Sequence, residues 1–160
     1  MNQKCQSLTA VNSKSAIDYL PVEKLSQLQS DRFRAIVKRA YTNTDLFRKR
    51  MDDIQLNPED IGGIEDITKL PFSVKTDLRE TYPFGMFACP MKDVVRLHAS
   101  SGTTGKPIVV AYTGNDLNIW SSVILRTLAA CGVQKNDIIQ NAYGYGLFTG
   151  GLGLHYGGES

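Results

Sequence analysis

The sequence predicts an α/β fold, with a mostly helical segment over residues 1–90 and the start of an α/β core over residues 91–160. Apolar residues recur at helical spacing in the first segment, whereas the second has short β-branched runs on either side of one amphipathic stretch. The composition agrees, since 160 residues with 42% hydrophobic and 21% charged content can bury the core of one domain. We find no repeat, low-complexity tract or linker that divides the chain.

A helix with one buried face is predicted from Pro21 to Tyr41, because apolar residues recur there at i, i+3, i+4 and i+7. These positions are Leu25, Leu28, Phe33, Ile36, Val37, Ala40 and Tyr41. A shorter helix follows, with Phe47, Met51 and Ile54 as its apolar positions. The opposite faces carry Arg32, Arg34, Lys38, Arg39, Arg48, Lys49 and Arg50. A nucleic-acid-binding surface would combine such bases with aromatic platforms, so we interpret them as solvated helix faces.

Residues 57–90 contain only short pieces, which we interpret as connectors between larger elements. Ser73 lies three residues before Thr76 and four before Asp77, which is the spacing of a helix N-cap. A short helix from Val74 to Glu80, capped by Ser73, is therefore expected.

Two strands are predicted next, at residues 94–99 and 108–112, because both stretches are short, apolar and rich in β-branched residues. On the first, one face carries Val95, Leu97 and Ala99, and the other carries Val94, Arg96 and His98. His98 is either a catalytic group or a packed, structural histidine. The structural role is the commoner one, and we favour it.

The stretch between these strands is rich in hydroxyl groups and glycine, and it predicts a phosphate-binding loop. Its residues are Ser100, Ser101, Gly102, Thr103, Thr104, Gly105 and Lys106. Hydroxyls donate to phosphate oxygens, the glycines let the backbone approach, and Lys106 supplies positive charge. The close glycines and the strand after Pro107 exclude the Walker A loop and the Rossmann fingerprint, which lead into helices. A flexible turn is the alternative interpretation.

A helix is predicted after the second strand, since Thr113 and Asp116 have the spacing of a capping box. Its apolar stripe consists of Leu117, Trp120, Ile124 and Leu128. Gly132 is expected to end this helix. A turn at residues 135–137 then leads to a third strand, predicted from Ile138 to Ala142.

Residues 143–158 hold seven of the fourteen glycines, which allows two interpretations. The backbone either packs closely around a ligand or forms a flexible tail. Large rings alternate with the glycines, which favours the wall of an aromatic pocket.

Composition also narrows the class of protein. A net charge of +2 gives no field that attracts nucleic acid, so no such partner is expected. The three cysteines are too widely spaced for a disulfide framework or a metal motif, and with two histidines we expect no metal site. Residues 1–14 are polar and no apolar run has bilayer length, which predicts neither a signal peptide nor a membrane segment. A reducing, cytoplasmic location fits best.

Taken together, three motifs resemble those of the phenylacetate-coenzyme A ligases, a branch of the adenylate-forming acyl-CoA synthetase superfamily. They are His-Ala-Ser-Ser-Gly-Thr-Thr-Gly-Lys-Pro at 98–107, Leu-Pro-Phe-Ser-Val-Lys-Thr-Asp-Leu-Arg at 70–79 with Tyr-Pro-Phe-Gly at 82–85, and the glycine- and tyrosine-rich stretch at 143–157. The resemblance extends from about Tyr19 to Ser160. It implies a helical segment followed by the first strands and helices of the large domain of such an enzyme, an incomplete α/β unit.

The resemblance implies an enzyme that joins phenylacetate or a similar aryl acid to coenzyme A in two steps. The carboxylate attacks the α-phosphate of Mg-ATP to give an acyl-adenylate and pyrophosphate, and the thiol of coenzyme A then displaces AMP. ATP, Mg²⁺ and coenzyme A are therefore the expected cofactors and substrates. The loop at 100–106 would hold the β- and γ-phosphates, with Lys106 as an electrostatic partner and not as the base.

The resemblance also implies an aryl-acid pocket made by Tyr143, Tyr145, Phe148, Gly150 and Leu154. Tyr143 and Phe148 would line it, with Tyr145 and Gly150 near it and Leu154 as a wall. If this pocket and the phosphate loop share one site, strand 138–142 should run parallel to strand 94–99 and antiparallel to strand 108–112.

No catalytic residue is expected within the chain. By the resemblance, the catalytic lysine would lie beyond Ser160, together with the adenine- and ribose-binding motifs and the small C-terminal domain. The chain alone is therefore expected to be inactive, because both sides of the cleft are needed.

Other classes of function remain open at this point. The chain could bind a nucleotide phosphate or a partner chain without chemistry, and a homodimer is compatible with the apolar surface that a missing half would leave. Among enzymes, the alternatives are ligases for indoleacetate or hydroxybenzoates and enzymes that adenylylate a deazaflavin.

Overall fold

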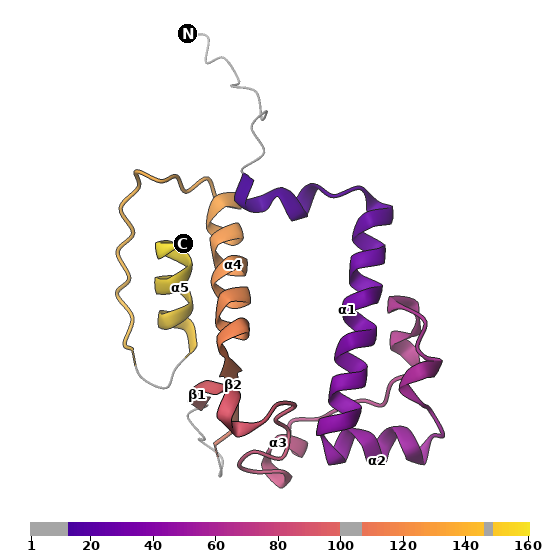
Figure 1. Cartoon of the computed structure of the whole chain (residues 1–160). Coiled ribbons are helices and arrows are strands. Elements are labelled where there is room, and N and C mark those ends of the chain that lie inside the picture. Colours follow the sequence, from indigo (N-terminus) through magenta and orange to yellow (C-terminus); the bar gives the residue numbers. More distant parts are fainter. Residues whose placement is uncertain (1–12, 100–106, 146–148) are drawn as a thin grey trace.

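The computed structural model describes residues 13–99, 107–145 and 149–160 (Figure 1). The predicted phosphate loop and Phe148 lie outside these ranges. The elements are η1 (Ser13–Tyr19), α1 (Val22–Asn43), α2 (Asp45–Asp53), η2 (Pro58–Asp60), η3 (Ile64–Lys69), α3 (Asp77–Glu80), η4 (Met91–Asp93), β1 (Val94–Ala99), β2 (Val109–Thr113), α4 (Gly114–Ala130) and α5 (Thr149–Glu159). Helices thus precede a small two-stranded sheet, which confirms an incomplete α/β fold.

The first helices enclose a small apolar core. Val37 of α1, Met51 of α2 and Ile61 are at most 2% exposed. Phe33, Tyr41, Phe47, Leu56 and Leu70 pack around them. The predicted helices over 21–41 and around Met51 are therefore confirmed. Ile36 is an exception to the predicted buried face: it is 54% exposed and lines a cleft of about 250 Å³ between α1 and β2.

The basic residues of α1 and α2 are only partly the solvated faces that we predicted. Arg32, Lys38 and Arg39 are exposed. Arg50 instead forms a two-pronged ion pair with the carboxylate of Asp77, at 2.6 and 2.8 Å, and also donates to the carbonyl of Phe72. Asp77 is 2% exposed, so this ion pair joins α2 to the segment at 72–77. A contact across 27 residues has no periodic signature in the sequence.

Asp77 also explains why the expected cap by Ser73 is wrong. Its carboxylate accepts the amide of Val74 at 2.8 Å, which turns the chain at 74–77 before the helix begins. Helix α3 is thus shorter than predicted, with Thr76 at its N-cap and no side-chain cap bond, while Ser73 is exposed. The hydrogen bond from Arg50, the amide of Val74 and the charge of Arg50 all lower the pKa of Asp77.

Strands β1 and β2 form an antiparallel hairpin, and the paired residues include Arg96 with Tyr112 and Ala99 with Val109. The prediction that the loop at 100–106 joins two strands is confirmed. The alternation along β1 is also confirmed, but the buried face is the polar one. His98 is 2% exposed, whereas Val95 is 62% and Leu97 38% exposed.

Helix α4 begins and ends as predicted. The Thr113 hydroxyl accepts the amide of Asp116 at 3.2 Å, and the Asp116 carboxylate accepts the amide of Thr113 at 2.8 Å. At the other end Gly132 has φ +88°, a left-handed conformation that glycine adopts without strain. Its amide donates to Ala129, and the amide of Val133 donates to Leu128, which satisfies the last carbonyls.

Residues 149–159 of the glycine-rich stretch are not a flexible tail, because they form helix α5, which packs against α4 (Figure 1). A methyl group placed on Gly153 would lie 2.6 Å from the ring of Trp120, and one on Gly157 would overlap the side chain of Ile124. Glycine is a poor helix former, but here it lets two helices approach closely. Tertiary packing therefore overrides the local preference.

The predicted third strand does not form among the described residues, and its expected direction relative to β1 and β2 stays a prediction. Residues 138–142 are extended, but in the described ranges the only sheet is β1–β2. A strand requires a hydrogen-bonded neighbour, and none of the described segments supplies one. The adjacent turn at 135–136 is present, with the Asp137 amide bonded to the carbonyl of Gln134 at 3.0 Å.

The two ends of the molecule are tied together by η1. Figure 1 shows it crossing from the start of α1 to the end of α4. There the guanidinium of Arg126 on α4 pairs with the carboxylate of Asp18. In the described ranges, no helix combines the length and apolar character needed to cross a membrane.

Candidate functional site

The end of the hairpin positions the predicted phosphate loop. Ala99 pairs with Val109, so the two chain ends that bracket residues 100–108 are held side by side, about 5 Å apart as in any antiparallel pair. The side chains next to this loop on the buried face of β1 are Arg96 and His98.

His98 is buried in an aromatic cluster. Its ring meets the ring of Tyr112 edge-on at 5.1 Å and that of Trp120 at 5.6 Å. Tyr112 and Trp120 are themselves stacked at 5.3 Å. Neither ring nitrogen of His98 bonds to any part of the chain that the structure describes. Burial, and secondarily the charge of Arg96, lower the pKa of His98, which favours a neutral, packed imidazole.

Arg96 lies beside a cavity of about 240 Å³ between β1, α4 and α5. The lining residues are Arg96, Leu117, Asn118, Trp120, Ser121, Gly153 and Tyr156. The guanidinium of Arg96 sits over the ring of Tyr156, 4.8 Å from its centre, in a cation–π contact. This aromatic and cationic lining contains no carboxylate, so the cavity suits neutral or anionic groups.

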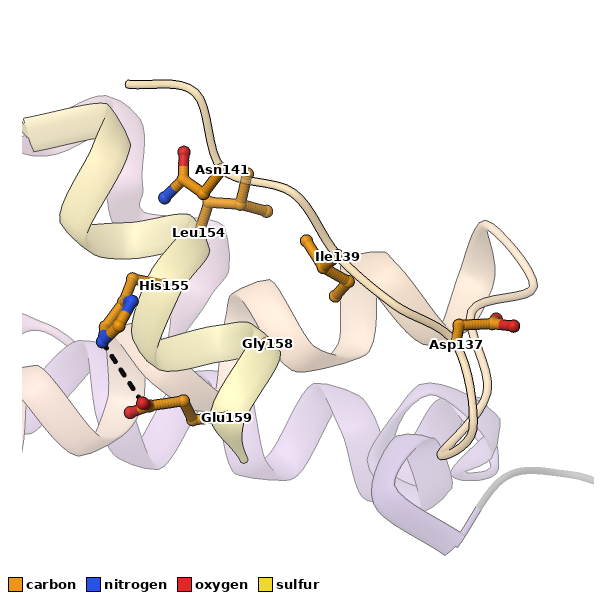
Figure 2. A pocket seen from close by; sticks show the side chains of 7 residues that line it. All are labelled: Asp137, Ile139, Asn141, Leu154, His155, Gly158 and Glu159. Atoms are coloured by element: carbon orange, nitrogen blue, oxygen red, sulfur yellow. Dashed lines mark ion pairs between the residues drawn. The ribbon is translucent and has the colours of Figure 1, made fainter. Parts of the chain in front are cut away.

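The predicted aryl-acid residues are not gathered into one pocket by the described structure. Tyr143 and Tyr145 are 58% and 53% exposed on the extended run before α5. Gly150 is exposed in the first turn of α5, and Leu154 is half-buried one turn later. Leu154 lines a second cavity of about 240 Å³ between α5 and residues 137–141 (Figure 2). The other lining residues are Asp137, Ile139, Asn141, His155, Gly158 and Glu159.

A polar network at this cavity escaped the sequence prediction. The Asn141 amide donates to the Tyr145 hydroxyl at 3.2 Å and to the carbonyl of Gly151 at 2.8 Å. The Tyr145 hydroxyl lies 3.2 Å from Nδ1 of His155. Nε2 of His155 lies 3.3 Å from the Glu159 carboxylate, a contact that Figure 2 marks. The carboxylate favours a proton on Nε2, which leaves Nδ1 to accept from Tyr145.

This network fixes the direction of the Tyr145 ring relative to α5. One of its links could have been found in the sequence, because His155 and Glu159 are four residues apart, as neighbours on a helix face are. That signal was hidden because five glycines made a helix at 149–159 improbable by propensity.

The part of the chain that the structure describes contains no cluster of three or more His, Cys, Asp or Glu side chains suited to a metal ion. Cys89 is half-buried and Cys131 is exposed, and both are free thiols.

The arrangement of these elements is that of an adenylate-forming CoA ligase. One solved structure that it matches is 2-hydroxyisobutyryl-CoA ligase in complex with its acyl-adenylate 2-HIB-AMP and CoA, with a TM-score of 0.83 and 23% identity. That match covers 96% of this chain and 34% of the other. The same ligase in its postadenylation state matches with a TM-score of 0.81. At this identity, the likeness defines the fold class alone.

Sequence comparison identifies the branch. The chain is 54% identical over 138 residues to a phenylacetate-coenzyme A ligase of Pseudomonas putida, covering 86% of this chain and 31% of that protein. It is 50% identical over 144 residues to the ligase of the same name from Thermus thermophilus, covering 90% and 32%. No family model matches. The chain is thus about half identical to phenylacetate-CoA ligases along most of its own length, and it spans about a third of the length of these curated relatives.

Proposed function

We propose that this chain is the phosphate-binding and aryl-acid-binding part of an ATP-dependent ligase that joins phenylacetate to coenzyme A. The observation that carries the proposal is the identity of about half with curated phenylacetate-CoA ligases along most of the chain. The hairpin β1–β2 supports it, because it brackets a hydroxyl- and glycine-rich loop with the chemistry that phosphate requires.

The proposed reaction has two steps. A carboxylate oxygen of the acid forms a bond to the α-phosphorus of ATP as the bond to pyrophosphate breaks, and the product is an acyl-adenylate. The thiol sulfur of coenzyme A then attacks the acyl carbon, its proton is lost, and AMP leaves. In this proposal residues 100–106 stabilise the charge that builds on the departing pyrophosphate, with Lys106 as the positive partner.

Mg²⁺ is part of the proposal as a companion of the nucleotide. Magnesium in nucleotide sites is held largely by phosphate oxygens and water with one or two carboxylates. The described residues offer no preformed cluster of acids for it, which fits an ion that arrives with ATP.

The aryl group is proposed to lie against Tyr143, Tyr145, Phe148, Gly150 and Leu154. Two structural facts support this choice. Leu154 already lines a cavity, and the ring of Tyr145 is held in place by Asn141 and His155. The rings of Tyr143 and Tyr145 are more than half exposed, which fits one side of a pocket whose other side is supplied by residues outside this chain.

The chain alone is proposed to be catalytically incomplete. Its matched relatives are about three times as long, and the proposal assigns the catalytic lysine and the adenine and ribose contacts to their unmatched part. We divide this chain into a helical segment at 1–90 and the start of the core at 91–160. A cytoplasmic location completes the proposal, since Cys89 and Cys131 are free thiols, as in a reducing compartment.

The test is exchange of labelled pyrophosphate into ATP that depends on phenylacetate. It is made with the 160-residue chain and with a chimera that joins this chain to the remainder of the P. putida ligase. We expect exchange with the chimera alone. Exchange by the short chain would contradict the incomplete site, and a chimera that exchanges only with indoleacetate or a hydroxybenzoate would replace phenylacetate by that acid.

A second candidate is phosphate binding without chemistry, which the short span relative to the relatives favours. It predicts that the chain alone binds pyrophosphate or ATP. Calorimetric titration of the chain and of a Lys106→Ala variant tests this, because loss of the positive charge should weaken binding. No binding by the unmodified chain would remove this candidate.

A further inference from the structure

Residues 138–142 follow the course of a strand that has no neighbour. They belong to the extended run between α4 and α5, and they lie against α5 (Figure 1). None of the described residues forms a backbone hydrogen bond with them. Their amide and carbonyl groups are therefore free to pair with another extended segment.

The side chains of this segment alternate as they do in a half-covered strand. On the inner side, the Ile139 side chain is 40% exposed and ends beside Gly158, and Asn141 donates to the carbonyl of Gly151 at 2.8 Å. On the outer side, Ile138 is 97% exposed, and Gln140 and Ala142 are exposed as well. A period of two with one covered face is the mark of a β-strand.

Ile138 is more exposed than any other large hydrophobic residue in the described ranges. Proteins normally cover an exposed isoleucine at an unpaired strand edge. The unpaired backbone groups of such an edge are a template for pairing with another strand. The inner contacts with α5 hold the edge in place, so a partner would meet a strand that is already extended and oriented.

We propose that residues 138–142 are the edge to which a strand from the unmatched part of a phenylacetate-CoA ligase attaches, and that two separately produced pieces can assemble through it. The identity of this partner rests on the proposed function. The lengths support it: this chain accounts for 31–32% of the curated relatives and 34% of a solved ligase chain, while its own residues are matched almost throughout. In those ligases, the part that this chain does not match is therefore about twice as long as the matched part.

Strand addition fits this surface better than side-chain docking. The edge offers a row of backbone donors and acceptors, which give affinity, and one apolar side chain, which gives register. A second copy of the same chain could use the same edge, so the experiment separates a partner strand from self-pairing.

The test mixes the 160-residue chain with the separately produced remainder of the P. putida ligase and measures association by calorimetry and size-exclusion chromatography. We expect a one-to-one complex in which the amides at 138–142 gain protection from hydrogen exchange. Ile138→Asp and Gln140→Pro should each raise the dissociation constant about tenfold or more, because one places a charge in the interface and the other removes a backbone donor.

Both variants alter exposed positions without backbone partners, so the far-UV circular dichroism of the chain should not change. Val22→Asp is the matched control: Val22 is β-branched, 76% exposed and at the start of α1, where aspartate is tolerated. This control should bind like the unmodified chain.

Three results would overturn the proposal: no complex, a complex that neither variant weakens, or a dimer of the chain alone that both variants disrupt. The readouts also separate this inference from the proposed function. A complex that depends on Ile138 but shows no phenylacetate-dependent exchange would support the docking edge and contradict the assigned acid.

Discussion

The helical unit at 22–80 and the unit at 94–159 differ in how their hydrophobic side chains are buried. The first has a buried apolar core around Met51, and Arg50 is paired to Asp77 beside it. The second packs α4 against α5 through glycines, yet it leaves Ile138, Tyr143 and Tyr145 largely exposed. The residues proposed to bind phosphate and acid belong to this second unit. Among the described residues, the buried hydrophobic core therefore belongs to the first unit, and the proposed site belongs to a unit without one.

The largest effect is expected from Met51→Ala, which removes the side chain at the centre of the first unit. Truncating a fully buried methionine costs about 2–5 kcal/mol, because it leaves a cavity as well as losing buried area. Urea unfolding followed by circular dichroism at 222 nm measures the loss. Met91→Ala is the control, since Met91 is 49% exposed and should change stability little.

The same variant shows how independent the two units are. The only tryptophan, Trp120, lies in α4 and reports on the second unit. If the units are independent, the Trp120 fluorescence transition of Met51→Ala should shift less than the circular dichroism transition. Coincident shifts would mean that the chain unfolds as one body and that the comparison of two units does not hold for stability.

A smaller effect is expected from Gly157→Ala, which tests the glycine packing of the second unit. Overpacking of this kind lowers the free energy of unfolding by about 1–3 kcal/mol. The better helix propensity of alanine offsets about 1 kcal/mol of this loss. Gly158→Ala is the neighbouring control: its methyl would meet only the mobile end of Ile139, so it should be neutral or stabilising. Equal effects at both positions would contradict the close approach of α5 to α4.

Thr113→Ala should cost about 1 kcal/mol, because it removes the side-chain half of the cap at the start of α4. Thr113→Ser keeps the hydroxyl and should retain most of the stability. Thermal unfolding monitored by Trp120 fluorescence gives both values. A serine variant as unstable as the alanine variant would show that the methyl group of Thr113, and not its cap bond, is what matters.

The smallest effect is expected on the pH dependence of stability, through the titration of His98. The pKa of His98 is lowered in the folded chain, so the unfolded chain binds the proton more tightly. Its contribution to stability is present above the unfolded pKa of about 6.5 and is lost as the pH falls from there through the folded value. His98→Phe should flatten stability between pH 7 and 5 relative to the unmodified chain. An unchanged slope would mean that other groups set it.

Local features of the fold could be predicted from the sequence. The capping box at Thr113, the glycine stop at Gly132 and the periodicity of α1 each depend on residues within one or two turns of each other. The hairpin was predictable for the same reason, since its two strands flank one loop.

Features that depend on distant residues could not be predicted. Arg50 was read as a solvated base because its partner lies 27 residues away. The helix at 149–159 could not be predicted because Trp120 and Ile124, which require its glycines, are in another helix. Residues 138–142 have the pattern of a strand, but a pattern cannot supply the neighbour that pairing needs. Of the site, the phosphate loop lies outside the described residues and stays a prediction, as does the role of Leu154, which lines a cavity. The contact of His155 with Tyr145 was missed.

The ion pair between Arg50 and Asp77 also constrains how this sequence can change over generations. Replacing Arg50 alone leaves the buried charge of Asp77 without compensation, and such an intermediate is strongly disfavoured, whereas an unpaired Arg50 keeps 29% of its side chain exposed. The two codons are therefore expected to drift together, and a lineage that loses the arginine should already have neutralised the aspartate. The contact between α2 and α3 is thus expected to correlate substitutions at two positions that lie far apart in the sequence.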